Sequence, residues 1–540
     1  MATGKKKNNY IEHGGTKMIA MYPLFFLFLL KIAFMTRKIG VNGIAYYAMA
    51  FALFFVVYSL NGNLITEILR KMVLFQVNRR SVRNAIKLNR VILQFTWITT
   101  IICSGVLFIL SEKISVLLFA TSLVSLPIKL FSLALFCIVP QQCMKGYLEG
   151  ISGQLPGVVS MFIQIIIDLI TTVLVQNSFM NYGRKISLLM RNEQYYYSYA
   201  SLSGIIGLCV GSFFSLLFLL LITGLLKQMQ KERMRNDESK SKLSGGDILH
   251  NYLLNVLSEF VPNMFGPIMI LLFYVMFSHK TPDHFEQSGI VFVSLLAGLP
   301  VLMNAVMQGK FAYRQVHSLL RRQDVAMARD KIAFQIKSNL YFSLMISVFL
   351  MFSAKSFNVL FFDHAKEELI SVFRYSQAII FIFALAIMIL NMLMAYVGKI
   401  VVDVLYVTGI GALFVFEFIF LKAGMTGILP YISSLLMSCV WIALLGGFVL
   451  FKKSRCKNDL LRVFVLPLIA AVGLMLVCLL VDQLLFDSLG ALICLVLCVV
   501  LGYLCYQLII IMTRTFDKYE WVDLPFADIP IFLAKKLNMY

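Results

Sequence analysis

The stretch GYLEGISGQLPGVVSMFIQIIIDLI, residues 146–170, places a glycine-rich polar segment directly before a long apolar run that contains one acid, Asp168. Glycine and proline supply the backbone freedom and the stop that a sharp connection needs, so the sequence predicts a turn over 146–157. About 20 apolar residues suffice to cross a bilayer as a helix, and the run that follows is long enough to do so. The stretch therefore predicts two membrane helices joined by a short turn.

The composition of the whole chain extends this interpretation to an integral membrane protein. Apolar residues make up 60% of the 540 residues, charged residues 14%, and the mean hydropathy is +0.84. Soluble domains contain roughly 45–50% apolar residues. The net charge of +21 is by itself compatible with nucleic-acid binding. However, the basic residues stand in connections between apolar runs, where positive charge sets membrane orientation, and this excludes nucleic acid as the expected partner.

The same length criterion predicts an all-α polytopic protein with about fourteen transmembrane helices. The predicted spans cover 16–36, 42–64, 89–110, 125–144, 155–176, 198–226, 249–277, 287–308, 334–354, 370–394, 401–421, 427–450, 460–481 and 488–512. An even number of spans places both termini on one side of the membrane. Basic clusters follow spans 2, 6, 8 and 12, so both termini are predicted to be cytoplasmic. The first span lacks a small-residue cleavage pattern and is expected to be retained.

Two pairs of similar segments indicate an internal repeat. RRSVRNAIKLNR, from Arg79, follows span 2, and RRQDVAMARDKI, from Arg321, follows span 8. GYLEGISG after span 4 is matched by AYVGKIVVD after span 10. Parallel repeats of this kind are common in transporters, with a substrate path between the halves. The predicted parts are an N-terminal lobe (1–226, spans 1–6), a cytoplasmic linker (227–247), a C-terminal lobe (248–456, spans 7–12), spans 13 and 14 (457–514) and a cytoplasmic tail (515–540).

No pattern in the sequence points to catalysis. Ser/His/Asp sets, paired carboxylates and phosphate-binding glycine loops are missing, and the cysteines and histidines do not have metal-ligand spacing. We therefore expect no catalytic residue, no metal and no cofactor, apart from coupling to Na⁺, H⁺ or the membrane potential. A membrane glycan ligase or polymerase is disfavoured because the connections on the outer side, including 177–197 and 355–369, are short. Transport is the favoured class of function.

Charged residues inside the spans are the candidate site residues, because intramembrane charge is costly and usually functional. Lys31 lies in span 1 and Arg37 at its end; each can contact an anionic substrate or extend towards the head groups. Asp168 lies in span 5, with Gln164 one turn earlier on the same face. This acid can line a cavity, pair with a buried base, or stand at a helix end.

Two further acids and three prolines complete the candidates. Glu259 lies in span 7 and Glu417 in span 11, where a buried acid can bind a cation, take up a proton or pair with a base. Pro23 interrupts span 1, and its counterpart, span 7, contains Pro262 and Pro267. Each proline removes one backbone hydrogen bond, so these positions are either hinges or fixed kinks that shape the packing.

Four stretches in order carry a family resemblance: MTRKIGVNGIAYYAMA (35–50), MKGYLEGISGQLPGVVSMFIQ (144–164), AGLPVLMNAVMQGKFA (297–312) and LKAGMTGILPYISS (421–434). With them the chain resembles the multidrug/oligosaccharidyl-lipid/polysaccharide exporter superfamily, in particular the branch of stage V sporulation protein B and the lipid II flippases. The resemblance implies a two-lobed bundle of fourteen helices in the bacterial cytoplasmic membrane. It also implies movement of an undecaprenyl diphosphate-linked saccharide by alternating access, glycan-assembly enzymes as partners, and a monomer.

The resemblance also bears on the candidate residues. Flippases of this branch carry basic residues in the first helix, which implies that Lys31 and Arg37 contact the diphosphate. On the fifth helix, however, Asp168 occupies what resembles a basic position, so lipid II itself is not implied as the cargo. The alternative within the superfamily is a cation-coupled multidrug antiporter of the MATE type. Glu259 suits that alternative, whereas Lys31 stands where an acid would be expected.

Overall fold

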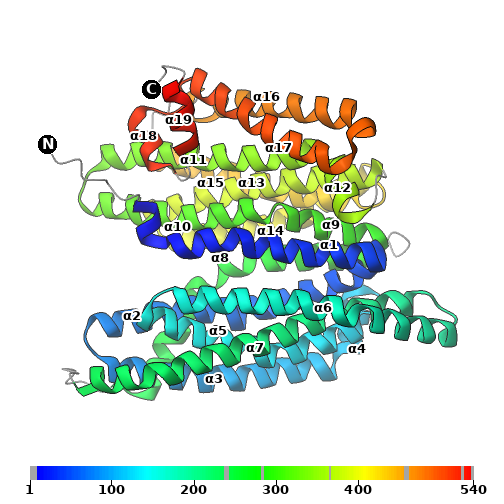
Figure 1. Cartoon of the computed structure of the whole chain (residues 1–540). Coiled ribbons are helices and arrows are strands. Elements are labelled where there is room, and N and C mark those ends of the chain that lie inside the picture. The colour runs from blue at the N-terminus through cyan, green and yellow to red at the C-terminus, as the bar shows by residue number, and fades with distance from the viewer. Residues whose placement is uncertain are drawn as a thin grey trace. The chain divides into compact units, whose positions relative to one another are not determined.

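The computed structural model describes residues 9–235, 243–280, 285–363, 367–454, 461–524 and 528–536, and within them the chain is helical with no strand (Figure 1). The predicted all-α class is therefore confirmed. The α-helices are α1 (Asn9–Tyr58), α2 (Leu64–Asn78), α3 (Val82–Ile109), α4 (Ser111–Phe119), α5 (Ser125–Ser152), α6 (Leu155–Met190), α7 (Gln194–Arg235), α8 (Gly245–Lys280), α9 (Phe285–Ala297), α10 (Leu299–Arg321), α11 (Val325–Phe352), α12 (Ala354–Phe362), α13 (Glu367–Val397), α14 (Lys399–Lys422), α15 (Leu429–Ser454), α16 (Leu466–Leu480), α17 (Phe486–Met512), α18 (Lys518–Asp523) and α19 (Asp528–Lys536). Short π-helical segments are η1 (Ser59–Asn63), η3 (Leu461–Val465) and η4 (Val481–Leu485).

Eleven helical stretches of the described chain are long and apolar enough to cross a membrane, and a bent pair, Gln287–Ala297 with Leu299–Arg321, makes a twelfth. Two of the eleven hold two predicted spans each. Ala20–Asn78 has 59 residues and is broken at Gly40, and Leu461–Met512 has 52 residues and is broken at Gly490. With the halves of these two stretches taken separately, each predicted span has a helical counterpart.

The backbone repeats itself along the chain. The helices α3 and α11 both have 28 residues, and α4 and α12 both have 9. In each pair the second helix begins 243 positions after the first, from Val82 to Val325 and from Ser111 to Ala354. The residues before and after these helices repeat as well, because positive φ angles occur at the same spacing. The repeated pairs are Arg80 with Gln323 and Ala120 with Asp363. The sequence similarity therefore reflects a repeated local geometry.

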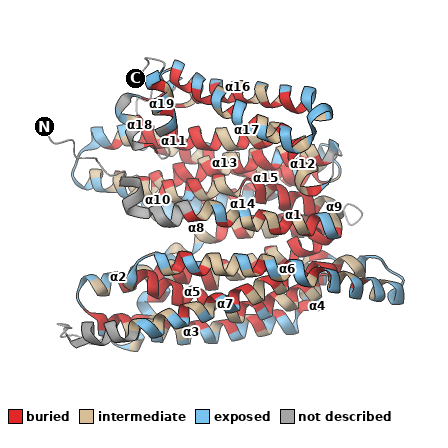
Figure 2. Ribbon diagram, in the orientation of Figure 1, coloured by how far each residue is buried: buried red, intermediate tan, exposed pale blue. Residues whose placement is uncertain are grey.

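Packing divides the structure into two compact units. Unit 2 is Ile19–Phe292, and unit 1 combines Met1–Met18 with Val293–Tyr540. In unit 2, α8 packs against α2, α3 and α4. Within this unit α5 is buried along much of its length, whereas the far ends of α6 and α7 are exposed (Figure 2). The predicted lobe borders stay a prediction, and residues 236–242 of the predicted linker lie outside the described residues.

The predicted turn over 146–157 is wrong in extent. The helix α5 continues to Ser152, α6 begins at Leu155, and only two residues connect them. Gly146 and Gly150 serve close packing on α2: a Cβ on Gly146 would lie 2.7 Å from the carbonyl oxygen of Thr66. Small residues four apart let membrane helices approach to backbone contact. The glycine that makes the turn is Gly153, with φ 92° and ψ −174°.

The connection predicted at 177–197 is largely helical, which the sequence analysis did not predict. The helix α6 runs to Met190 and α7 starts at Gln194, so the polar residues here belong to the ends of two long helices. Pro23, Pro262 and Pro267 lie inside α1 and α8. The non-helical residue within α1 is Gly40 and not Pro23. The role of the three prolines as hinges stays a prediction.

Replacing Gly398 by alanine is expected to lower the free energy of unfolding by about 1–3 kcal/mol, because its φ of 79° and ψ of −179° fall in a region essentially restricted to glycine. No atom lies within 4 Å of the added Cβ, so backbone strain is the only cost. Gly411→Ala is the control, since Gly411 is helical and equally open. The thermal melting temperatures of the purified proteins measure the difference, and equal melting of both variants and the parent would contradict the expectation.

Candidate functional site

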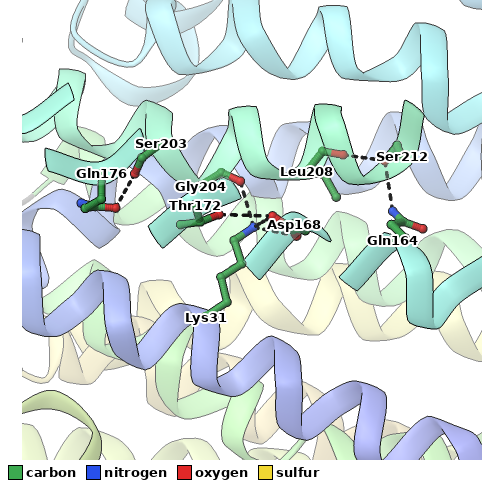
Figure 3. Close-up of polar contacts among 9 residues, drawn as sticks. All are labelled: Lys31, Gln164, Asp168, Thr172, Gln176, Ser203, Gly204, Leu208 and Ser212. Carbon is green, nitrogen blue, oxygen red and sulfur yellow. Dashed lines mark hydrogen bonds and ion pairs between the residues drawn. The ribbon is translucent and has the colours of Figure 1, made fainter. Parts of the chain in front are cut away.

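A buried ion pair joins α1 to α6 and α7 in unit 2 (Figure 3). The Lys31 Nζ donates to Asp168 Oδ2 at 2.9 Å and to the carbonyl oxygen of Gly204 at 2.8 Å, and it lies 2.8 Å from Asp168 Oδ1. The hydroxyl of Thr172 donates to Asp168 Oδ1 at 3.3 Å. Lys31 and Asp168 are both 0% exposed. The structure thus brings together two of the residues predicted from the sequence.

The surroundings of the pair explain why two charges are tolerated inside unit 2. A buried charge is costly unless it is paired and hydrogen-bonded. The ammonium of Lys31 meets the carboxylate and a backbone carbonyl, and the rings of Phe28 and Tyr47 lie 5.8 and 5.7 Å from it. The side chain therefore points into the protein rather than towards lipid head groups. In this conformation the three N–H groups of Lys31 are matched by three oxygens.

Glycines on α7 allow the three helices to meet this closely. A Cβ on Gly207 would lie 2.5 Å from Asp168 Oδ1 and 2.6 Å from the Asp168 backbone oxygen. A Cβ on Gly204 would lie 2.5 Å from the sulfur of Met35 on α1, and one on Gly211 would meet the backbone of Gln164. These glycines recur at three- and four-residue intervals and so lie on one face of α7.

Polar contacts continue along the same interface in both directions (Figure 3). Towards one end, Ser203 donates to Gln176 at 2.5 Å. Towards the other, Gln164 donates to Ser212 at 3.1 Å and accepts from Gln141 of α5 at 2.8 Å. Gln141 also donates to Ser215 at 2.7 Å, and Ser215 donates to the carbonyl of Ser160.

We name the polar residues of α6 the polar ladder: Ser160, Gln164, Asp168, Thr172 and Gln176. Four of the five are 0% exposed, and Gln164 is half-buried. The sequence prediction included Gln164 and Asp168 and missed the others. The signal was nevertheless present, because the five residues recur at every fourth position and such spacing places side chains on one face of a helix.

The other predicted residues lie elsewhere. Arg37 is exposed and is not part of the Lys31–Asp168 pair. The Glu259 side chain is 35% exposed, and its Oε1 lies 3.3 Å from the Nζ of Lys71 on α2. Glu417 is 9% exposed on α14 and belongs to unit 1. In the described part of the chain, no three His, Cys, Asp or Glu side chains are grouped to hold a metal ion.

The acid of the pair is confined to the first repeat. Asp168 stands 15 positions after the turn glycine Gly153, and the residue 15 positions after the corresponding Gly398 is Leu413. Leu413 is 0% exposed, so an apolar side chain fills the equivalent place on α14. The repeat therefore preserves the backbone but not the charge at this position.

Comparison with solved structures identifies the fold. Lipid II flippase MurJ in an inward closed conformation superposes with a TM-score of 0.63 at 14% identity, covering 92% of this chain and 98% of that one. An inward-facing multidrug resistance MATE family transporter of the MOP superfamily gives 0.60 at 15%, covering 82% and 100%. The eukaryotic MATE transporter AtDTX14 gives 0.55 at 16%, covering 83% and 97%. No family profile and no curated protein sequence matches the chain.

These likenesses confirm the predicted resemblance at the level of the fold. The chain has the polytopic helical fold that MurJ and the MATE transporters share within the MOP superfamily. The solved structures of this fold named above are of transporters, and the chain is a multi-pass membrane protein. Identities of 14–16% carry the comparison no further than the fold.

Proposed function

We propose that the protein exports a saccharide linked to undecaprenyl diphosphate across the bacterial cytoplasmic membrane by alternating access, without catalysing a reaction. The observation that carries the proposal is the extent of the structural match. The flippase covers 92% of this chain, but the two MATE transporters cover 82% and 83%. The coverage by the flippase exceeds the coverage by the MATE transporters by about a tenth of the chain. This is about the length of the 52-residue stretch Leu461–Met512, which follows the two repeats.

The chemistry of the ion pair supports an anionic cargo. Sugars and a diphosphate cannot cross hydrocarbon unaided, since desolvating charges and unpaired hydroxyls costs many kcal/mol. The polar ladder and Lys31 give the interface of α1, α6 and α7 in unit 2 a polar interior that contains a buried cation. Because Asp168 and Gly204 already occupy the N–H groups of Lys31, a diphosphate can bind this lysine only by displacing Asp168. We infer that the cargo and Asp168 compete for Lys31.

This competition also suggests how transport is coupled. A carboxylate released from Lys31 would be an unpaired buried charge, which costs several kcal/mol. Binding of H⁺ or Na⁺ by Asp168 would remove that cost, and Thr172 already donates to this carboxylate. We therefore propose that cargo binding on Lys31 and cation binding on Asp168 accompany one another. Arg37, exposed at the outer end of the first span, would draw the anionic cargo from the pair towards the outer side.

The proposal is tested in vesicles containing the purified protein and a fluorescent saccharide on undecaprenyl diphosphate. We expect the saccharide to become accessible to a lectin across the membrane only when the protein is present. Arg37→Ala should slow this transfer, and Lys113→Ala, which removes another exposed base of unit 2, should not. The same saccharide on a neutral lipid is the control for charge recognition. Absence of transfer by protein that melts cooperatively would overturn the proposal.

The alternative, a cation-coupled MATE-type antiporter, is tested in the same vesicles with a cationic dye. The TM-scores of 0.60 and 0.55 with MATE transporters show that the fold is also compatible with such an antiporter. Against it, the carboxylate of Glu259 is paired with Lys71. Dye movement driven by a Na⁺ or pH gradient, and its loss in Glu259→Gln, would establish the alternative.

We also propose a monomer with both termini in the cytoplasm, with glycan-assembly enzymes supplying or consuming the cargo. Two repeated basic turns support this orientation, since positive charge marks the cytoplasmic side. They lie at Arg79–Arg80, between α2 and α3, and at Arg321–Arg322, where α10 ends and the turn to α11 begins.

A further inference from the structure

The far ends of α6 and α7, residues 177–197, form a helical hairpin that we call the arm. The helices have 36 and 42 residues, so α6 alone is about 54 Å long, whereas the hydrocarbon core of a bilayer is about 30 Å thick. Figure 1 shows both helices continuing past the neighbouring helices of unit 2, at the end opposite the α2–α3 turn. Their counterparts in the second repeat, α14 and α15, have only 24 and 26 residues. The arm is therefore an addition to the first repeat.

The arm is built as a rigid element. A Cβ on Gly183 would lie 2.9 Å from the carbonyl oxygen of Tyr196, so the two helices touch at the backbone. The rings of Tyr182 and Tyr199 pack edge to face at 5.3 Å, and the Arg184 guanidinium lies 5.7 Å from the ring of Tyr196. Each helix thus holds the other in place up to the tip, which is the geometry of a preorganised binding element.

The tip carries an apolar patch surrounded by positive charge. Leu188, Leu189 and Met190 are 79%, 77% and 59% exposed, and Figure 2 shows this end of the hairpin as exposed. Three bases stand against one acid in the arm; they are Arg184, Lys185 and Arg191, and the acid is Glu193. Met, Tyr and Arg are enriched at protein interfaces, and contiguous exposed apolar side chains mark interaction sites.

The height of the tip places it beyond the lipid head groups. The apolar run of α6 ends at Val175, and Met190 stands 14 positions after Gln176, which is about 21 Å of helix. The head-group region adds only about 5–7 Å on each side of the hydrocarbon core. A lipid surface therefore does not cover the exposed leucines. A second copy of the chain is disfavoured as well, because two tips of equal positive charge repel.

We propose that the arm docks a protein whose surface presents an apolar pocket rimmed by carboxylates. Carboxylates complement Arg184 and Lys185, and a pocket removes Leu188 and Leu189 from water. A glycan is a poorer fit, since three adjacent aliphatic side chains offer it no hydrogen bonds. The arm is independent of the Lys31–Asp168 pair, so the docking function stands apart from the proposed cargo.

The test places a photo-reactive amino acid at position 189 of the full-length protein in cells. We expect an adduct with one other protein, cross-linked through a peptide that contains carboxylates. The double variant R184E/K185E should lower the adduct yield at least about tenfold. The matched controls are a photo-reactive residue at Leu117, which is 72% exposed on α4 of the same unit, and the variant Lys113→Glu.

Charge exchange makes the test decisive. Changing the mapped carboxylates of the partner to lysine should restore the adduct with R184E/K185E. An adduct with lipid, glycan or a second copy of this chain would overturn the proposal, as would no adduct or one whose yield is insensitive to R184E/K185E. Because adduct formation requires no transport, failure here is distinguishable from failure of the proposed export.

Discussion

Lys31→Met alone is expected to lower the free energy of unfolding by about 3–5 kcal/mol, whereas Lys31→Met combined with Asp168→Leu is expected to restore stability and still abolish export. The single change leaves the fully buried Asp168 charge without its partner. The double change replaces both charges by apolar side chains of similar size, which is often neutral or stabilising. Abundance in the membrane and the melting temperature measure folding, and saccharide transfer in vesicles measures export.

Melting temperature and saccharide transfer together distinguish a purely structural contact between helices from a cargo-binding site. If the pair only fastens α1 to α6 and α7, the double variant will fold and export at the normal rate, and our assignment of Lys31 to the cargo will be wrong. The control is Tyr182→Leu with Tyr199→Leu, which removes another α6–α7 contact without removing a charge or a residue of the polar ladder. That variant should retain both folding and export.

Gly207→Leu is expected to cost about 3 kcal/mol or more, because the new side chain has no room between α6 and α7. The first carbon alone would lie 2.6 Å from the backbone oxygen of Asp168, and backbone cannot rotate away as a side chain can. The helices must separate, which also opens the contact of Lys31 with Gly204. The control is Gly224→Leu on the same helix, since Gly224 is exposed with no atom within 4 Å.

Membrane abundance and thermal melting distinguish the two leucine variants. Gly224→Leu should behave as the parent or slightly better, because leucine favours a helix more than glycine does. Normal abundance and melting of Gly207→Leu would show that α6 and α7 are not closely packed at this position.

The sequence predicted the helical class and the position of the spans because both depend on the local density of apolar residues. It also located Asp168 and Gln164, since an acid among isoleucines is conspicuous. It did not identify Lys31 as the partner of Asp168. The two residues are 137 positions apart, and their contact depends on how α1, α6 and α7 pack. Contacts between distant helices leave no mark in a single sequence.

The wrong extent of the predicted turn and the unpredicted helical structure of 177–197 have related physical causes. Glycine serves both turns and close helix packing, and the sequence does not distinguish Gly153, which turns the chain, from Gly146, which lies against α2. Polar residues likewise serve both loops and helices that extend into water. The segment 177–197 does connect the two spans, but the sequence did not reveal that it consists of the ends of two helices.

The closed state of the Lys31–Asp168 pair has a consequence for the resting protein. Opening the pair without ligands leaves two unpaired charges in a low-dielectric interior. This open state lies several kcal/mol above the closed one, so it is rarely populated. If only an anion bound to Lys31, the charge of Asp168 would be left without a partner. If only a cation bound to Asp168, the charge of Lys31 would be left without one. If the proposed function holds, the protein does not conduct ions at rest, because a cation crosses the membrane only when cargo crosses as well.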